Sequence, residues 1–159
     1  MYERILLAYD GTLEGAVALR EGALLAKRCG AKVFILSVVP QGTGVHVAEG
    51  IYAAAISHQL DSYKDLLARG VARLRRLGLD PVARVTVGEP VKAICAFAKE
   101  VDADLVVVGH QKKGLLDRWW SGSTGAYLSD YIRCSLLIAR NQVSDEAFAA
   151  ELDAAGEKV

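Results

Sequence analysis

The stretch Leu105-Val106-Val107-Val108-Gly109 is apolar at consecutive positions and ends in glycine. Such runs are typical of a strand buried on both faces of a parallel sheet, because neither face of that strand meets solvent. Three more runs share this character, at residues 5–9, 32–39 and 134–139. A further run at 82–87 alternates valine with Arg84 and Thr86. This alternation predicts a strand at the edge of the sheet.

Segments with the apolar spacing of helices lie between these runs, at about residues 13–29, 51–77, 90–101 and 123–133. Thr12 is expected to cap the first helix and Gly30 to end it, while Pro90 suits a first helical position. The alternation of strands and helices predicts an α/β fold, a doubly wound, Rossmann-like, five-stranded parallel sheet with helices on both faces. Such sheets bind ligands beyond the carboxyl ends of their strands, where the strand order reverses.

The composition is that of one domain without net charge. The chain has 159 residues, 52% of them apolar, and its 19 Lys and Arg balance 19 Asp and Glu. This balance argues against a protein that mainly binds nucleic acid or an anionic membrane, since both require an excess of basic residues. No apolar run approaches the ~20 residues of a bilayer span, and the N-terminal residues do not read as a signal peptide. A cytoplasmic location is therefore expected.

The cysteines Cys29, Cys95 and Cys134 are widely spaced and form no Cys-x-x-Cys pair. Their spacing supports neither a disulfide framework nor a zinc site. They are therefore expected to act as small apolar residues in a reducing compartment.

The chain after Gly109 reads His-Gln-Lys-Lys-Gly-Leu-Leu-Asp-Arg-Trp-Trp-Ser-Gly-Ser-Thr-Gly, a basic loop followed by small residues that open a helix. Helix N-termini attract anions through their unpaired N–H groups. A P-loop is excluded, because Leu115 and Leu116 follow Gly114 where that motif needs Lys and Ser or Thr. A dinucleotide fingerprint is excluded as well, because Asp10-Gly11-Thr12-Leu13 follows the first strand.

Four features occur in order along the chain: Asp10-Gly11-Thr12, Val87-Gly88-Glu89-Pro90, Asp104-Leu-Val-Val-Val-Gly109 and Gly122-Ser123. In this order they resemble the universal stress protein family, from Tyr2 to Arg140. The nucleotide-binding branch of that family carries Gly-x2-Gly-x9-Gly-Ser/Thr. On this chain the first glycine of the motif is Gly109 and the final pair is Gly122-Ser123, but the second glycine position is Lys112.

The resemblance implies the strand order 3-2-1-4-5 and a pocket for ATP or another adenine nucleotide at the switch point between the first and fourth strands. Asp10 would lie beside the adenosine, and Val38 would contact the base. The other nucleotide-binding residues implied are Gly109, His110, Lys112, Lys113, Gly114, Gly122, Ser123 and Thr124. A Mg or Mn ion, if bound, would be held by the phosphates, since the sequence has no cluster of metal ligands.

The resemblance also divides the chain into a nucleotide-binding domain at 1–140 and an acidic C-terminal tail at 141–159, where a short surface helix is expected. It implies a homodimer formed through the last strand, whose apolar segment Leu136–Ala139 could present the edge.

Lys112 leaves two functions open. A side chain there obstructs backbone approach to phosphate or strains a positive φ by roughly 1–2 kcal/mol, whereas the ammonium groups of Lys112 and Lys113 favour a phosphate. The chain is thus either a stress-response regulator that binds an adenine nucleotide, or a homodimeric interaction protein of the same fold that has lost nucleotide binding. A Ser-Gly-Gly-x-Asp-Ser turn, which ATP pyrophosphatases of related fold require, is absent after the first strand.

No pair of nucleophile and general base is identifiable, so no catalytic residue is assigned and at most slow ATP hydrolysis is expected.

Other features have plain structural interpretations. Asp10 and Ser123 suit turn and helix capping without a ligand. His110 is expected to be a solvated residue of an exposed loop, and one ring of Trp119-Trp120 is expected to pack under that loop. The basic cluster at 69–76 is expected to be a solvated helix face.

Overall fold

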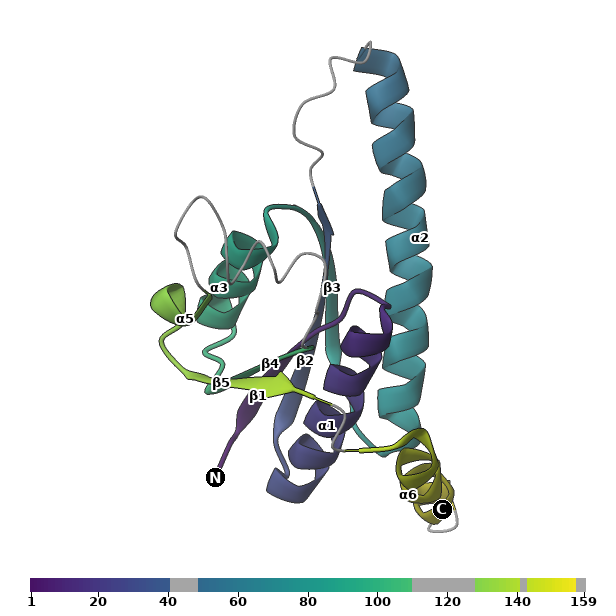
Figure 1. The fold of residues 1–159 in the computed structure, drawn as a ribbon, viewed down its shortest axis with the longest axis vertical. Coiled ribbons are helices and arrows are strands. Elements are labelled where there is room, and N and C mark those ends of the chain that lie inside the picture. The colour runs from purple at the N-terminus through teal and green to yellow at the C-terminus, as the bar shows by residue number, and fades with distance from the viewer. Residues whose placement is uncertain (41–48, 110–127, 141–142, 157–159) are drawn as a thin grey trace.

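The computed structural model describes residues 1–40, 49–109, 128–140 and 143–156, and its elements alternate between strands and helices (Figure 1). The elements are β1 Arg4–Ala8, α1 Leu13–Cys29, β2 Lys32–Pro40, α2 Glu49–Arg76, β3 Val82–Gly88, α3 Pro90–Glu100, β4 Leu105–Gly109, α5 Leu128–Tyr131, β5 Ser135–Ala139 and α6 Asp145–Gly156.

The five strands form one parallel sheet in the order β3-β2-β1-β4-β5. β1 lies in the middle, where Ile5 is paired with Val33 of β2 and with Leu105 of β4. The predicted fold class and strand order are therefore confirmed, and the strand order reverses between β1 and β4. β3 and β5 form the two edges of the sheet. The alternating run at 82–87 is an edge strand, as predicted.

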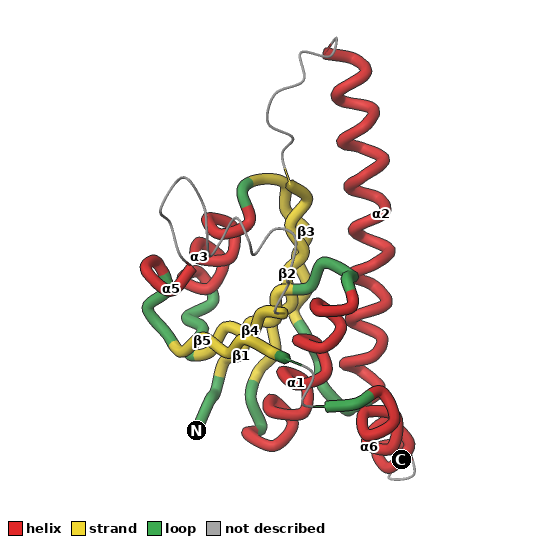
Figure 2. The backbone as a smooth tube through the Cα atoms, in the orientation of Figure 1, coloured by secondary structure: helices red, strands yellow, loops and turns green. Residues whose placement is uncertain are grey.

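Helices cover both faces of the sheet. α1 and α2 lie on one side, and α3 and α5 lie on the other (Figure 2). β1 serves both layers, since Ile5 and Leu7 belong to the core cluster with α1 and α2, whereas Leu6 belongs to the cluster with α3 and α5. All three side chains are fully buried. This two-sided burial explains why the strand is apolar at consecutive positions.

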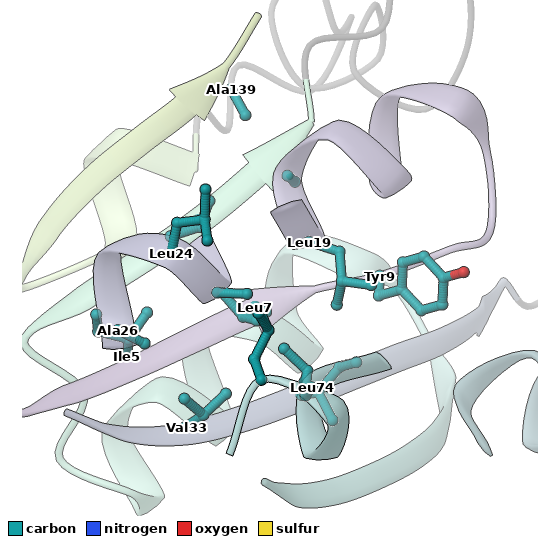
Figure 3. Packing of buried hydrophobic residues seen from close by; sticks show 14 of the residues in the cluster. Ile5, Leu7, Tyr9, Leu19, Leu24, Ala26, Val33, Leu74 and Ala139 are labelled. Atoms are coloured by element: carbon teal, nitrogen blue, oxygen red, sulfur yellow. The ribbon is translucent and has the colours of Figure 1, made fainter. Parts of the chain in front are cut away.

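The larger core cluster joins the two ends of the chain. Leu7 of β1 and Leu19 of α1 lie close together in it, and Leu74 of α2 packs from the adjacent helix (Figure 3). Phe148 of α6 is in the same cluster and is 4% exposed. The helix that occupies the acidic tail is thus packed against the core through this ring.

The ends of the helices follow local rules. The Thr12 hydroxyl accepts a hydrogen bond from the Gly15 N–H at 3.0 Å at the start of α1. Gly30 ends that helix with φ 64°, a left-handed conformation that glycine adopts without strain. Pro90 begins α3, after Glu89 as its N-cap. These three predictions are confirmed.

The limits of two helices differ slightly from the predicted ones, and part of another predicted helix lies outside the described residues. α2 begins at Glu49 and α3 ends at Glu100, each within two residues of the predicted limits. Of the helix expected at 123–133, the described residues contain α5 at Leu128–Tyr131, and residues 110–127 lie outside the described part of the chain. None of the helices in the described ranges is long and apolar enough to cross a membrane.

Candidate functional site

The candidate site lies at the carboxyl ends of β1, β2 and β4. β1 pairs with β2 through Ala8 and Leu36, and extending this register by two residues places Asp10 level with Val38. β1 pairs with β4 through Leu7 and Val107, which by the same step places Gly109 level with Tyr9. The structure therefore brings three of the predicted residues, Asp10, Val38 and Gly109, to one edge of the sheet.

Asp10 orders the turn between β1 and α1. Its Oδ1 atom accepts hydrogen bonds from the Thr12 backbone N–H at 3.0 Å and from the Thr12 hydroxyl at 2.6 Å. The same hydroxyl accepts from Gly15 inside the first turn of α1. Asp10 therefore has the structural role that its position predicts, which is to cap the turn after β1. The same hydrogen bonds hold its carboxylate in a defined position at the switch point.

The ends of β1 and β2 are tied together by a contact that the sequence did not reveal. Ser37 is fully buried in β2, and its hydroxyl donates a hydrogen bond to the Tyr9 carbonyl at 2.5 Å. The Tyr9 N–H donates to the Leu36 carbonyl at 2.9 Å. These bonds extend the pairing of the two strands beyond Ala8 toward the site, and they fix the backbone from which Asp10 projects.

Val38 is half-buried and faces the α3 side of the sheet. Its side chain packs against the core cluster formed by residues of β2, α3 and β4. Its neighbours Ser37 and Val39 are fully buried. Val38 therefore combines a fixed backbone with a partly accessible apolar side chain near the end of its strand, which suits contact with the flat face of a base.

α2 contributes two residues to the surroundings of Asp10 that sequence reasoning missed. Burial and the nearby negative charge of Asp10 raise the pKa of the Tyr63 phenol. Leu66, one turn along, lies over the turn before α1, because a Cβ on Gly11 would come within 1.8 Å of the Leu66 side chain. Gly11 also has φ 74°. Periodicity identifies α2, but no motif places Tyr63 or Leu66 beside the first turn.

Gly109 is explained partly by packing. A Cβ at this position would lie 2.3 Å from the carbonyl oxygen of Glu14 and 2.9 Å from the N atom of Gly15. The end of β4 therefore directly approaches the first turn of α1. A glycine at this switch point is required by the backbone contact itself, with or without a ligand.

The remaining predicted site residues lie outside the described part of the chain. These are His110, Lys112, Lys113, Gly114, Gly122, Ser123 and Thr124. Among the described residues, no group of three or more His, Cys, Asp or Glu side chains could hold a metal ion.

Comparison with known proteins identifies the family. The sequence model of the universal stress protein family matches residues 1–140. The chain belongs to the universal stress protein family. A Staphylococcus saprophyticus protein named for this family is 28% identical over an alignment of 155 residues, which covers 95% of this chain and 91% of that protein.

Solved structures of universal stress proteins share the fold. UspA from Lactobacillus plantarum has a TM-score of 0.73 and 22% identity, over 87% of this chain and 98% of that one. A universal stress protein determined in complex with cAMP has a TM-score of 0.67 and 22% identity, over 89% and 99%. One from Archaeoglobus fulgidus, in complex with dAMP, has a TM-score of 0.58 and 22% identity, over 87% and 98%. At these identities the likeness establishes the fold.

Proposed function

We propose that this universal stress protein is a cytoplasmic regulator that binds ATP or another adenine nucleotide at the switch point between β1 and β4. The observation that carries the proposal is the meeting of Asp10, Val38 and Gly109 at neighbouring strand ends. Ligands of doubly wound sheets bind in this place. Two proteins with the same fold were determined with cAMP and dAMP, and both of these ligands are adenine nucleotides.

The charges argue for one orientation of the nucleotide. The Asp10 carboxylate would repel a phosphate, but it can accept hydrogen bonds from ribose hydroxyls or from an adenine amino group. The adenosine would therefore lie at Asp10, with its base against Val38. The phosphates would extend toward Lys112, Lys113 and the small residues Gly122, Ser123 and Thr124, whose backbone N–H groups suit an anion.

A divalent cation is expected to bind only with the nucleotide. Asp10 already accepts two hydrogen bonds at Oδ1 from Thr12, so this oxygen atom is committed to the turn. A Mg or Mn ion would neutralise charge on the phosphates and would be held mainly by them. The role proposed for the protein is regulation through the bound state, with at most slow hydrolysis of ATP.

Lys112 favours a second candidate, a homodimeric interaction protein whose pocket no longer binds nucleotide. Its dimer would form through β5, which is an edge strand with three half-buried aliphatic residues, Leu136, Leu137 and Ile138. An unpaired strand edge of this kind can pair with a second chain. The two candidates share the fold and differ in whether the switch point holds a ligand.

Nucleotide content separates them. Freshly purified protein would be denatured, and the released small molecules would be separated by chromatography. Near-stoichiometric ATP, ADP or AMP supports the first candidate. Protein freed of ligand should then unfold at higher temperature with Mg-ATP, since a nucleotide at 100 times its Kd stabilises by about 2.7 kcal/mol. An empty extract together with an unchanged melting temperature in millimolar ATP, Mg-ATP and cAMP would refute nucleotide binding.

Two substitutions locate the site. Asp10→Asn keeps a hydrogen-bond acceptor and the shape of the side chain but removes its negative charge, so we expect weaker nucleotide binding. Asp80→Asn, an exposed position after α2, is the matched control and should bind as the wild type does. Lys112→Gly restores the family's glycine. Tighter binding would show that the lysine obstructs the pocket, and weaker binding would show that its charge contributes to holding phosphate.

A further inference from the structure

A cavity lies on the α3 side of the sheet, and none of the residues that line it belongs to the candidate site described above. It has a volume of about 420 Å³ and is bounded by the C-terminal half of α3 and the segment that leads from α5 into β5. Two of the three cysteines of the protein, Cys95 and Cys134, line it. Both are half-buried, and both pack against the core cluster on this face. The proposed nucleotide site uses neither of them.

The fold brings these two cysteines together from distant parts of the chain. Burial is the main cause that raises the pKa of each thiol, and negative charge on Glu89 and on Cys134 raises the pKa of Cys95 further. Both cysteines line the same cavity, so the fold places their side chains beside one shared space. The third cysteine, Cys29, ends α1 and packs against the cluster on the opposite face of the sheet. Cys29 is therefore placed away from this pair.

We propose that Cys95 and Cys134 form a reversible dithiol–disulfide pair, a modification site that a peroxide oxidises. The thiolate of one cysteine attacks a peroxide oxygen, the O–O bond breaks, and a sulfenic acid and one water (or an alcohol, from an organic peroxide) result. The thiolate of the other cysteine attacks the sulfenic sulfur, the S–O bond breaks, and a disulfide and a second water form. Two thiols lose two hydrogens, and the peroxide is reduced.

The surroundings determine how this pair reacts. Thiolates are the reacting species, so raised pKa values make oxidation slow at neutral pH. Some dithiols are strong oxidants because their reduced form is stabilised as a thiolate. The same burial denies Cys95 and Cys134 this stabilisation. The pair is thus expected to respond to sustained peroxide, and to be reduced again by a small dithiol.

The crosslink would join two elements that only non-covalent packing holds together in the reduced protein. Cys134 directly precedes β5, and Cys95 lies in the middle of α3. The disulfide would fix the start of the edge strand against the helix layer. This strand is the one through which the homodimer is proposed. The modification site itself rests on neither the nucleotide nor the dimer.

Mass spectrometry of the full chain tests the proposal. Fully reduced protein would be exposed to hydrogen peroxide, blocked with an alkylating agent, and digested without reduction. We expect a linked peptide pair that contains Cys95 and Cys134, an intact mass lower by two hydrogens before alkylation, and loss of the link on treatment with dithiothreitol. Recovery of the two cysteines only in separate peptides, alkylated or as sulfinic acids, would overturn the proposal.

Three variants serve as controls. Cys29→Ser should form the same link as the wild type, whereas Cys95→Ser and Cys134→Ser should each form none. A linked product between Cys29 and either other cysteine, at the expense of the Cys95–Cys134 link, would also overturn the proposal. The decisive measurement is made on the wild-type chain, so it does not depend on how well a variant folds.

Discussion

Gly109, the last residue of β4, lies directly against the backbone of Glu14 in the first turn of α1. A Cβ on Gly109 would come within 2.3 Å of the Glu14 carbonyl oxygen. The contact joins the fourth strand to the start of the first helix at the switch point of the sheet. It shows that this glycine is needed for the fold before any ligand is considered.

We therefore expect Gly109→Ala to destabilise the ligand-free protein by about 1–3 kcal/mol, since the new methyl group overlaps backbone atoms that move only with the helix. Urea unfolding measures this. Gly30→Ala is a useful comparison, because Gly30 has a positive φ but a Cβ there would meet no atom within 4 Å, so its cost is backbone strain alone. If Gly109→Ala were as stable as the wild type, α1 would have moved away from the new methyl group without a cost in the free energy of unfolding, contrary to this expectation.

Glu89 caps α3 with its carboxylate. Oε1 accepts from the Val91 N–H at 3.0 Å, and Oε2 accepts from the Lys92 N–H at 3.3 Å. Glu89→Ala should lower the free energy of unfolding by about 0.5–2 kcal/mol, because it leaves these N–H groups without the cap. Lys92→Ala is the control, since it keeps the capped N–H and removes only an exposed side chain. Equal stability of the two variants in urea would contradict the capping role.

Phe148 tests whether the acidic tail belongs to the folded unit. Its ring is buried in the cluster with α1 and α2, and the buried Arg20 of α1 is paired with the Asp145 carboxylate at the start of α6. Phe148→Ala should cost about 3–5 kcal/mol in thermal or urea unfolding, as expected for removal of a buried ring. Asp153→Ala, at an exposed position on α6, should change stability by less than about 0.5 kcal/mol. A silent Phe148→Ala would indicate that the tail is dispensable.

The edge strand β3 is joined to α3 by an exposed ion pair that should respond to acid. The Arg84 guanidinium donates two hydrogen bonds to the Glu100 carboxylate, at 2.5 and 2.6 Å, and lies 4.2 Å from the centre of the Phe97 ring. The pairing lowers the pKa of Glu100 from its ordinary value of 4.5. The folded state thus binds this proton less tightly than the unfolded state does.

The contribution of Glu100 to the free energy of unfolding is consequently complete above its ordinary pKa, which applies to the unfolded chain. This contribution is lost as the pH falls through the lowered pKa of the folded state. The difference in stability between wild type and Glu100→Gln should be largest near neutral pH and should close in acid. It should also shrink in high salt, because both groups are exposed. Urea titrations across this pH range measure it. A difference that stays constant down to about pH 3 would show that the carboxylate charge is not what stabilises the contact.

Several features of this protein followed from local sequence. Runs such as Leu105–Gly109 identified the buried strands, because burial on both faces requires apolar residues at consecutive positions. Thr12, Gly30 and Pro90 marked helix ends through backbone chemistry that acts within a few residues. The family resemblance added the strand order, which alternation alone leaves open.

The candidate site could be predicted only in part. Asp10 and Gly109 stand at the ends of recognisable strands, so topology alone places them at the switch point. Tyr63 and Leu66 lie in the interior of a long helix, and no local signal shows which loop that helix covers. Ser37 looked like an ordinary strand residue, yet its hydroxyl joins β1 to β2.

The amino-acid sequence by itself determined the order of strands and helices, the helix ends and the family, because these depend on residue type and on spacing along the chain. Only the tertiary structure decided that Gly109 meets Glu14, that Tyr63 lies near Asp10, and that Cys95 and Cys134 share a cavity. Each of these relationships joins residues that are far apart in the sequence. Their distances are set by how helices pack on the sheet, and the local pattern of residues does not encode that packing.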